Sequence, residues 1–230
     1  MRGLSTERNI QVGFTSTFLK PSVGRVHLRL AASTRYRAWV NGKFVGHGPS
    51  RGPHGFYRVD IWDIGALLKP GENIVAIEVA GYNCNSFYTL DQPSFLHAEV
   101  ANGTRVLAST GGPGMPFAAR RLEERVRKVP RYSFQRPFME IWNLAPEWDA
   151  WRTSPKGTSE PLENLAERRL LGHGAPLPKW EVRRPKRLLS EGKVVPVAQP
   201  ARPWKDPSLT AKGPQLQGFR EAELTTVPPL

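Results

Sequence analysis

Two closely spaced acids stand out in this sequence, because their types and spacing could do chemistry. Asp60 and Asp63 flank Ile61 and Trp62, which places an aromatic ring between the two carboxylates. A protonated acid and a carboxylate base roughly 6.5–9.5 Å apart can hydrolyse a glycosidic bond by inversion. The same spacing is typical of a turn or a single helical turn, in which Asp side chains cap backbone N–H groups. We favour capping for Asp60 and Asp63. Four other acids lie on or beside predicted strands, and the sequence does not indicate that any two of them converge: Glu78, Asp91, Glu99 and Glu140.

The histidines, the cysteine and a glycine-rich stretch carry weaker signals. Cys84 stands between two asparagines and has no adjacent basic residue to lower its pKa, so a partly buried thiol is expected rather than a nucleophile. Gly111-Gly112-Pro113-Gly114 lacks the Lys-Ser/Thr pair of a phosphate-binding loop. No metal-ligand spacing joins the histidines, which are His27, His47, His54, His97 and His173. The sequence therefore predicts no metal and no other cofactor.

Two places combine aromatic and polar side chains as carbohydrate sites do, with a flat ring for the sugar face and amides for its hydroxyls. Trp39 falls on the polar side of its predicted strand, together with Arg35 and Arg37. Sugar stacking, a cation–π contact with arginine, or burial against another domain would each explain a water-facing Trp there. The second place follows the most apolar predicted strand, and its candidate binding residues are Tyr82, Asn83, Asn85 and Tyr88. At both places we favour a structural role, in which the amides satisfy their own backbone and the rings close the end of the fold.

The net charge of +13 raises the question of nucleic-acid binding. Basic residues cluster in 120–136 and in 183–187, but Glu123 and Glu124 interrupt the first cluster. No helix-turn-helix, RNA-recognition, KH or zinc-finger signature accompanies them. A solvated or interdomain face is therefore favoured, and nucleic acid is not expected as a partner.

The first 150 residues are patterned as β-strands joined by turns. Residues 25–30 and 35–40 alternate apolar and polar side chains, as half-buried antiparallel strands do. Asn41-Gly42 fits the two-residue turn of a β-hairpin, and residues 74–80 form a nearly all-apolar run suited to a central strand. Two further strands are expected on either side of Asn102-Gly103, at 95–100 and 104–109, and a late strand at 138–142. The class predicted is all-β, an antiparallel β-sandwich of the jelly-roll type.

The last third of the chain differs in composition. Residues 151–230 hold 12 of the 22 prolines, which makes long helices improbable there. The pattern of 161–171 is typical of a helix, with Gly172 as its C-cap. We expect a β-sandwich over 8–152, followed by a proline-rich, mostly irregular connector with short strands over 153–230 that leads to an absent domain. The sequence has no apolar run of membrane-spanning length and no secretory signal pattern, so a cytoplasmic protein is predicted.

Several strings of residues, in register over about 10–152, resemble known domains. Residues 36–46, 56–60 and 67–73 are similar to the hairpin, strand and turn of the sugar-binding-like (galactose-binding-like) jelly roll found in many glycoside hydrolases. More narrowly, residues 48–55, 81–88, 91–96 and 134–138 resemble the N-terminal β-sandwich region of bacterial α-L-rhamnosidase-like proteins.

That resemblance implies a parent glycosidase whose catalytic carboxylates lie in a separate (α/α) barrel, for which 230 residues leave no room. The expected function is a non-catalytic accessory module of such an enzyme, with no catalytic residues of its own. Its expected partners are the missing catalytic domain and rhamnose-containing glycans. The alternative is an autonomous, lectin-like carbohydrate-binding module.

Overall fold

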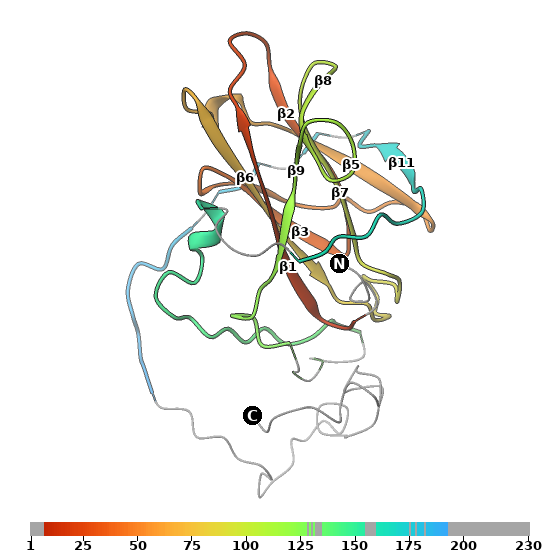
Figure 1. Cartoon of the computed structure of the whole chain (residues 1–230). Coiled ribbons are helices and arrows are strands. Elements are labelled where there is room, and N and C mark those ends of the chain that lie inside the picture. The colour runs from red at the N-terminus through yellow and green to blue at the C-terminus, as the bar shows by residue number, and fades with distance from the viewer. Residues whose placement is uncertain are drawn as a thin grey trace, which may run out of the picture.

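Two sheets of mostly antiparallel strands face each other across an apolar core (Figure 1). The computed structural model describes residues 7–127, 129, 131, 135–154, 160–174, 176–177, 179–181 and 183–192. The first sheet has the order β10-β1-β6-β3-β4, and the second has the order β11-β5-β2-β7-β8-β9. The predicted β-sandwich is therefore confirmed.

The strands of the first sheet are β1 (Ile10–Leu19), β3 (Arg35–Val40), β4 (Lys43–Gly48), β6 (Glu72–Gly81) and β10 (Ala118–Arg121). Those of the second sheet are β2 (Val26–Ser33), β5 (Phe56–Asp63), β7 (Phe95–Asn102), β8 (Arg105–Ser109), β9 (Met115–Pro116) and β11 (Arg169–Gly172). Two three-residue 3-10 turns, η1 (Gly65–Leu67) and η2 (Ala150–Arg152), make up the helical structure of the described residues.

Strand β6 is the central strand of the first sheet, and its side chains from Ile74 to Ala80 are apolar except for Glu78. It pairs with β1 from Glu72 to Gly81 and with β3 from Val75 to Ala80. Strand β2 plays the same part in the second sheet and shows the predicted alternation: Val26, Leu28 and Leu30 face the core. Burying each such side chain stabilises the fold by about 1.5–3 kcal/mol.

The Asn41-Gly42 turn forms as the sequence predicts, whereas Asn102 ends strand β7 and the second hairpin turns at 103–104. Asn41 and Gly42 both have positive φ, of 50° and 75°, which a type I′ hairpin turn requires. Asn41 also donates from Nδ2 to the side-chain oxygen of Asn73 at 2.8 Å, and its own Oδ1 accepts from the Ile74 amide. The buried Asn73 side chain in turn holds the loop before β6 through Lys69 and Gly71. This amide pair connects the two turns at the end of the sandwich where β6 begins.

The segment after β10 covers the outer face of the first sheet. Trp151, in η2, is 3% exposed and packs edge-to-face on Trp39, with ring centroids 6.2 Å apart. The close approach depends on Gly13, since a Cβ there would lie 2.9 Å from the Trp151 ring. Trp39 is consequently buried, at 7% exposed, and the expectation that it faces water is wrong. Among the three explanations offered for it, the structure shows the arginine contact: the Arg152 guanidinium lies 4.1 Å from the Trp39 ring centroid.

Two predicted elements are wrong. Residues 160–168 have no helical structure, and 169–172 form strand β11, which pairs parallel to the edge strand β5. The open edge of β5 offers backbone partners that a short helix would not use, and this outweighs a weak helical propensity. Residues 138–142 form no strand either: Phe138 and Trp142 make isolated bridges to Arg131 and Arg125.

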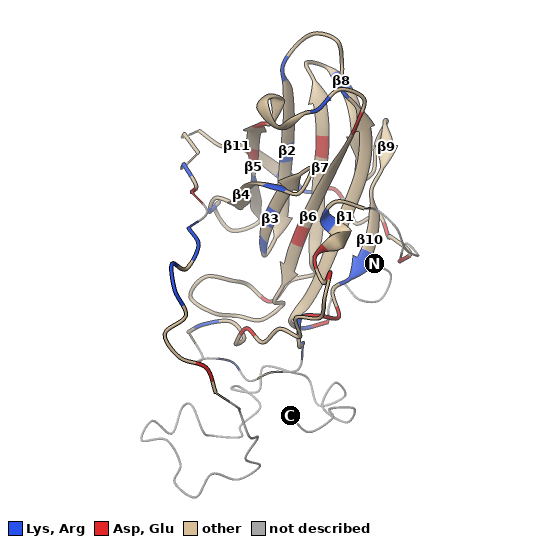
Figure 2. Cartoon of the chain, turned by 90° about the vertical axis from the view of Figure 1, so that its left-hand side faces the viewer, with Lys and Arg blue, Asp and Glu red and all other residues tan. Residues whose placement is uncertain are grey.

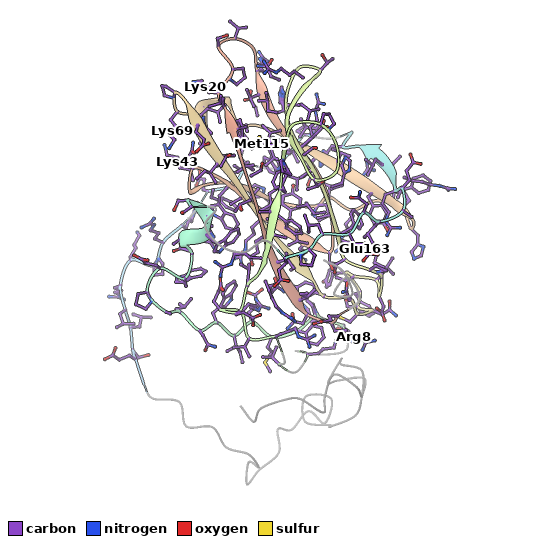
Figure 3. The ribbon with its side chains drawn as sticks, viewed as in Figure 1. Arg8, Lys20, Lys43, Lys69, Met115 and Glu163 are labelled. Atoms are coloured by element: carbon purple, nitrogen blue, oxygen red, sulfur yellow. The ribbon has the colours of Figure 1, made fainter. Side chains whose placement is uncertain are left out.

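No helix in the described part of the chain is long and apolar enough to cross a membrane. Lys20 and Lys69 in loops and Lys43 at the start of β4 lie at the end of the sandwich where β6 begins, and Figure 3 shows them close together. Figure 2 shows that positions of Lys and Arg alternate with positions of Asp and Glu along the strands.

Candidate ligand-binding groove

Two loops enclose a groove of about 500 Å³ at the end of the sandwich where β2 and β6 finish. One wall is the chain from His47 to Arg58, and the other is the loop from Ser86 to Gln92, with 32–35 between them. We call this the loop groove. Its volume lies within the usual range for small-ligand sites, about 300–1,000 Å³.

The loop groove joins two stretches that are far apart in the sequence. Residues 48–55 and 81–88 are the two blocks that carry the narrower resemblance described above. Strands β4 and β6 run in the same direction, because each is antiparallel to β3 between them, so both end on the same side of the first sheet. The fold therefore gathers these blocks at one place.

A chain of polar side chains lies beneath the 47–58 wall. Asp60 is fully buried, and its Oδ2 accepts from the Tyr36 hydroxyl at 2.5 Å, which itself accepts from Trp62 Nε1 at 2.9 Å. Burial and the adjacent carboxylate raise the pKa of Tyr36, which keeps the hydroxyl a neutral donor. On the other side, His173 Nε2 contacts Asp60 Oδ1 at 3.5 Å and also contacts Ser50 Oγ. The network thereby ties the 47–58 wall to β5 and to the residue after β11.

The grouping of Ser50, His173 and Asp60 is not a catalytic triad. In a triad the histidine contacts the serine through one ring nitrogen and the carboxylate through the other. Here both contacts are made by Nε2 of His173, so the carboxylate cannot orient a base that activates the serine. The three side chains are assigned a structural role.

Strand β4 can pass over this network because it has no side chain at Gly48. A Cβ at that position would fall 2.7 Å from Tyr36 Cε1 and would overlap Asp60 Oδ2. Gly48→Ala is therefore expected to cost about 1–3 kcal/mol of unfolding free energy, measured by urea denaturation. Gly172→Ala is the matched control, because a Cβ there meets nothing within 4 Å. Equal stability of the two variants would contradict the close packing described here.

Aromatic rings and arginines line the opening of the loop groove. Tyr88 is 44% exposed and Phe87 is 69% exposed, both on the 86–92 wall. The Arg51 guanidinium lies 4.9 Å from the Tyr88 ring centroid, reaching across from the other wall. Inside, Tyr57 donates to Gln92 Oε1 at 2.7 Å, which connects the walls a second time.

The other candidate binding residues of this stretch have structural partners. Tyr82 is buried with Cys84 and Phe138. Asn83 is buried and donates to the Glu7 carbonyl at 2.6 Å, while its Oδ1 accepts from Ser94 at 2.7 Å. Asn85 Oδ1 accepts from the Asp91 amide at 2.9 Å. Of the four, Tyr88 lines the loop groove. Asn85 binds the backbone of its own loop, whereas Asn83 binds the more distant Glu7 and Ser94.

The acids do not converge on a site. Asp63 accepts from the Gly65 amide at 2.9 Å, the capping role expected of it, whereas Asp60 lies within strand β5 on its core face, so the expected turn is wrong for Asp60. Each of the remaining candidate acids contacts an arginine: Glu78 with Arg37, Asp91 with Arg8, Glu99 with Arg29 and Glu140 with Arg125.

Three arginines of the first basic cluster form ion pairs within the chain. Arg120, Arg121 and Arg125 form ion pairs with Glu124, Glu7 and Glu140, respectively.

Cys84 is buried, and burial raises the pKa of its thiol, as expected for an unreactive cysteine. Within the described ranges, no three His, Cys, Asp or Glu side chains gather as a metal site.

Sequence reasoning missed the contributions of Ser50, His173 and Arg51. Ser50 and Arg51 are adjacent in the sequence, but their partners are distant: the pairing of β11 with β5 brings His173 to Ser50, and the approach of the two loops brings Tyr88 to Arg51. The available signal for the buried network was the spacing of Asp60 and Trp62: they are two residues apart, so both side chains lie on the core face of strand β5.

The fold and the loop groove together define a β-sandwich module that has, at one end, a groove lined by arginines and aromatic rings. The chain is similar to a GH78 family rhamnosidase of Bacillus sp. GL1, with 32% identity and a TM-score of 0.56, over 60% of this chain and 15% of that one. The predicted resemblance to the β-sandwich region of α-L-rhamnosidase-like proteins is confirmed by this similarity.

Two further rhamnosidases are more distant. The α-L-rhamnosidase of Streptomyces avermitilis has 20% identity and a TM-score of 0.41, over 59% of this chain and 14% of that one. The enzyme of Aspergillus terreus has 17% identity and a TM-score of 0.40, over 56% and 16%. No protein-family model and no protein of curated function matches the chain. The chain thus spans about one-seventh of the length of the rhamnosidases it resembles.

Proposed function

We propose that this chain is a non-catalytic accessory module of an α-L-rhamnosidase-like glycoside hydrolase. The observation that carries the proposal is the likeness to the Bacillus rhamnosidase, which covers 60% of this chain but 15% of that enzyme. The arginine contacts of the candidate acids support it, because an inverting hydrolase needs two opposed carboxyl groups at its substrate. The proposed partner of the module is a separate catalytic domain. From the sequence, we also propose that this chain is cytoplasmic.

The full chain is expected to release no chromophore from an aryl α-L-rhamnoside above the rate of a buffer blank. A rhamnosidase that contains its catalytic domain, assayed at the same molar concentration, provides the positive control. Turnover that scales with the amount of this chain and persists through a second purification step would overturn the accessory role.

The alternative function is an autonomous, lectin-like carbohydrate-binding module. The exposed rings of Phe87 and Tyr88 at the loop groove favour it, because exposed aromatic rings stack on sugar faces. Under the accessory role, the affinity of the chain for free L-rhamnose is weak or absent. Tight binding of a neutral monosaccharide, measured by calorimetry, would favour the lectin.

A further inference from the structure

The charged side chains that line the loop groove are all basic. Arginines and histidines come from both sheets, while no Asp or Glu lines it: the charged or titratable side chains are Arg35, Arg51, Arg58, His47 and His54. A groove of one charge sign with low-dielectric walls attracts ligands of the opposite sign.

Two of these arginines have uncommitted hydrogen-bond donors. The third, Arg58, already donates hydrogen bonds to the backbone carbonyls of Arg51, Gly172 and His173. Arg35 and Arg51 are exposed, and neither guanidinium forms an ion pair with a residue that the structure describes. A planar guanidinium binds a carboxylate or sulfate through two parallel N–H donors, so these two arginines are suited to an anionic group.

His47 differs from the arginines in its charge. Burial, together with the charges of Arg35 and Arg37, lowers the pKa of its imidazole. At neutral pH the ring is uncharged and lies against Trp180, with centroids 3.8 Å apart. Because burial and the neighbouring arginines favour the neutral imidazole of His47, the arginines are the fixed positive charges of the loop groove.

Aromatic surface adjoins the basic surface. Phe87 and Tyr88 line the groove on one wall, and Arg51 reaches the Tyr88 ring from the other. Arg136 lies on the same ring, 5.6 Å from its centroid. A ligand with a flat apolar face and an anionic substituent would contact both kinds of surface at once.

We propose that the loop groove binds an acidic saccharide, in which a carboxylate or sulfate group pairs with Arg35 and Arg51 and a sugar face rests on the Phe87–Tyr88 wall. The inference rests on the proposed function for the saccharide part of the ligand. The anionic part comes from the lining of the groove.

The test is calorimetric titration of the full chain with matched probes at low salt. They are a short oligosaccharide that contains glucuronic acid, the same oligosaccharide with its carboxyl groups reduced to alcohols, a sulfated oligosaccharide of equal length, inorganic sulfate and a short single-stranded oligonucleotide. We expect the acidic form to bind at least about tenfold more tightly than its reduced form, because hydrogen bonds to charged groups are stronger than hydrogen bonds to neutral groups. The sulfated probe shows which of the two anionic groups is preferred.

Variants locate the binding. Arg35→Gln and Arg51→Gln are each expected to weaken binding of the acidic probe by about five- to tenfold and to leave the reduced probe unaffected. Arg105→Gln is the matched control, since Arg105 is exposed on the β7–β8 hairpin at the opposite end of the sandwich. Far-UV circular dichroism of all three variants establishes that they are folded.

Each outcome bears on one claim. Equal affinity for the acidic and reduced probes would overturn the anionic preference and leave carbohydrate binding intact. Equal affinity for inorganic sulfate or the oligonucleotide would show a general anion site and overturn the saccharide. Absence of binding by every probe would overturn the inference, while the accessory role would still be judged by the rhamnoside assay.

Discussion

Trp151→Ala is expected to lower the unfolding free energy by about 3–5 kcal/mol, the usual cost of removing a buried Trp side chain. The ring is 3% exposed and lies against Trp39 and Gly13. Leu122 belongs to the same buried cluster, so the Trp151 ring is a main apolar contact between the first sheet and the segment that follows β10. Urea denaturation followed by far-UV circular dichroism measures the loss.

Trp180→Ala provides the control for Trp151. Trp180 is 41% exposed and contacts His47, so its removal is expected to cost less than about 1 kcal/mol. Limited proteolysis of the Trp151 variant should also cleave within 122–154 sooner than in the parent. A Trp151 variant as stable as the Trp180 variant would refute the view that this segment is part of the sandwich.

Asp60→Ala is expected to cost about 3 kcal/mol or more, because it removes the acceptor of a buried hydroxyl and leaves a void. Tyr36 would lose the bond from its OH to Asp60 Oδ2, and His173 would lose its contact with Oδ1. The variant should therefore loosen the 47–58 wall as well as reduce the global stability. Denaturation and hydrogen exchange of the amides in 47–58 measure the two effects.

Two variants make the Asp60 experiment specific. Asp60→Asn retains the volume and one acceptor oxygen, so it is expected to recover most of the lost stability. Asp63→Ala removes a surface cap to Gly65 and is expected to cost about 0.5–1 kcal/mol. If Asp60→Ala were no more destabilising than Asp63→Ala, the buried network would not be a source of stability.

The strands and hairpins were predictable because their determinants are local. Alternation in 25–30 and the apolar run in 74–80 decide which side chains are buried, and Asn41-Gly42 adopts the positive φ angles that its turn needs. The errors fall where local pattern is weak. Residues 161–171 and 138–142 were assigned by propensity, but the open edge of β5 and the bridges to Arg125 and Arg131 decided their structure.

The site was less predictable than the fold. Tyr88 was named from the sequence, and it lines the loop groove, whereas Trp39 was expected to face water and is covered by Trp151 and Arg152. Alternation shows which side of a strand is polar in pattern, but it does not show whether a later segment folds over that side. An arginine–tryptophan stack can bury a side that contains both charge and aromatic surface.

From the amino-acid order alone follow the all-β class, the hairpins and the likeness to the rhamnosidase β-sandwich, since these depend on periodicity and short strings of residues. The tertiary structure decided which distant residues meet: Ser50 with His173, Arg51 with Tyr88, and Trp39 with Trp151. The physical reason is that such contacts arise from sheet order and loop packing. Those depend on the free energy of the whole chain and on no single stretch of it.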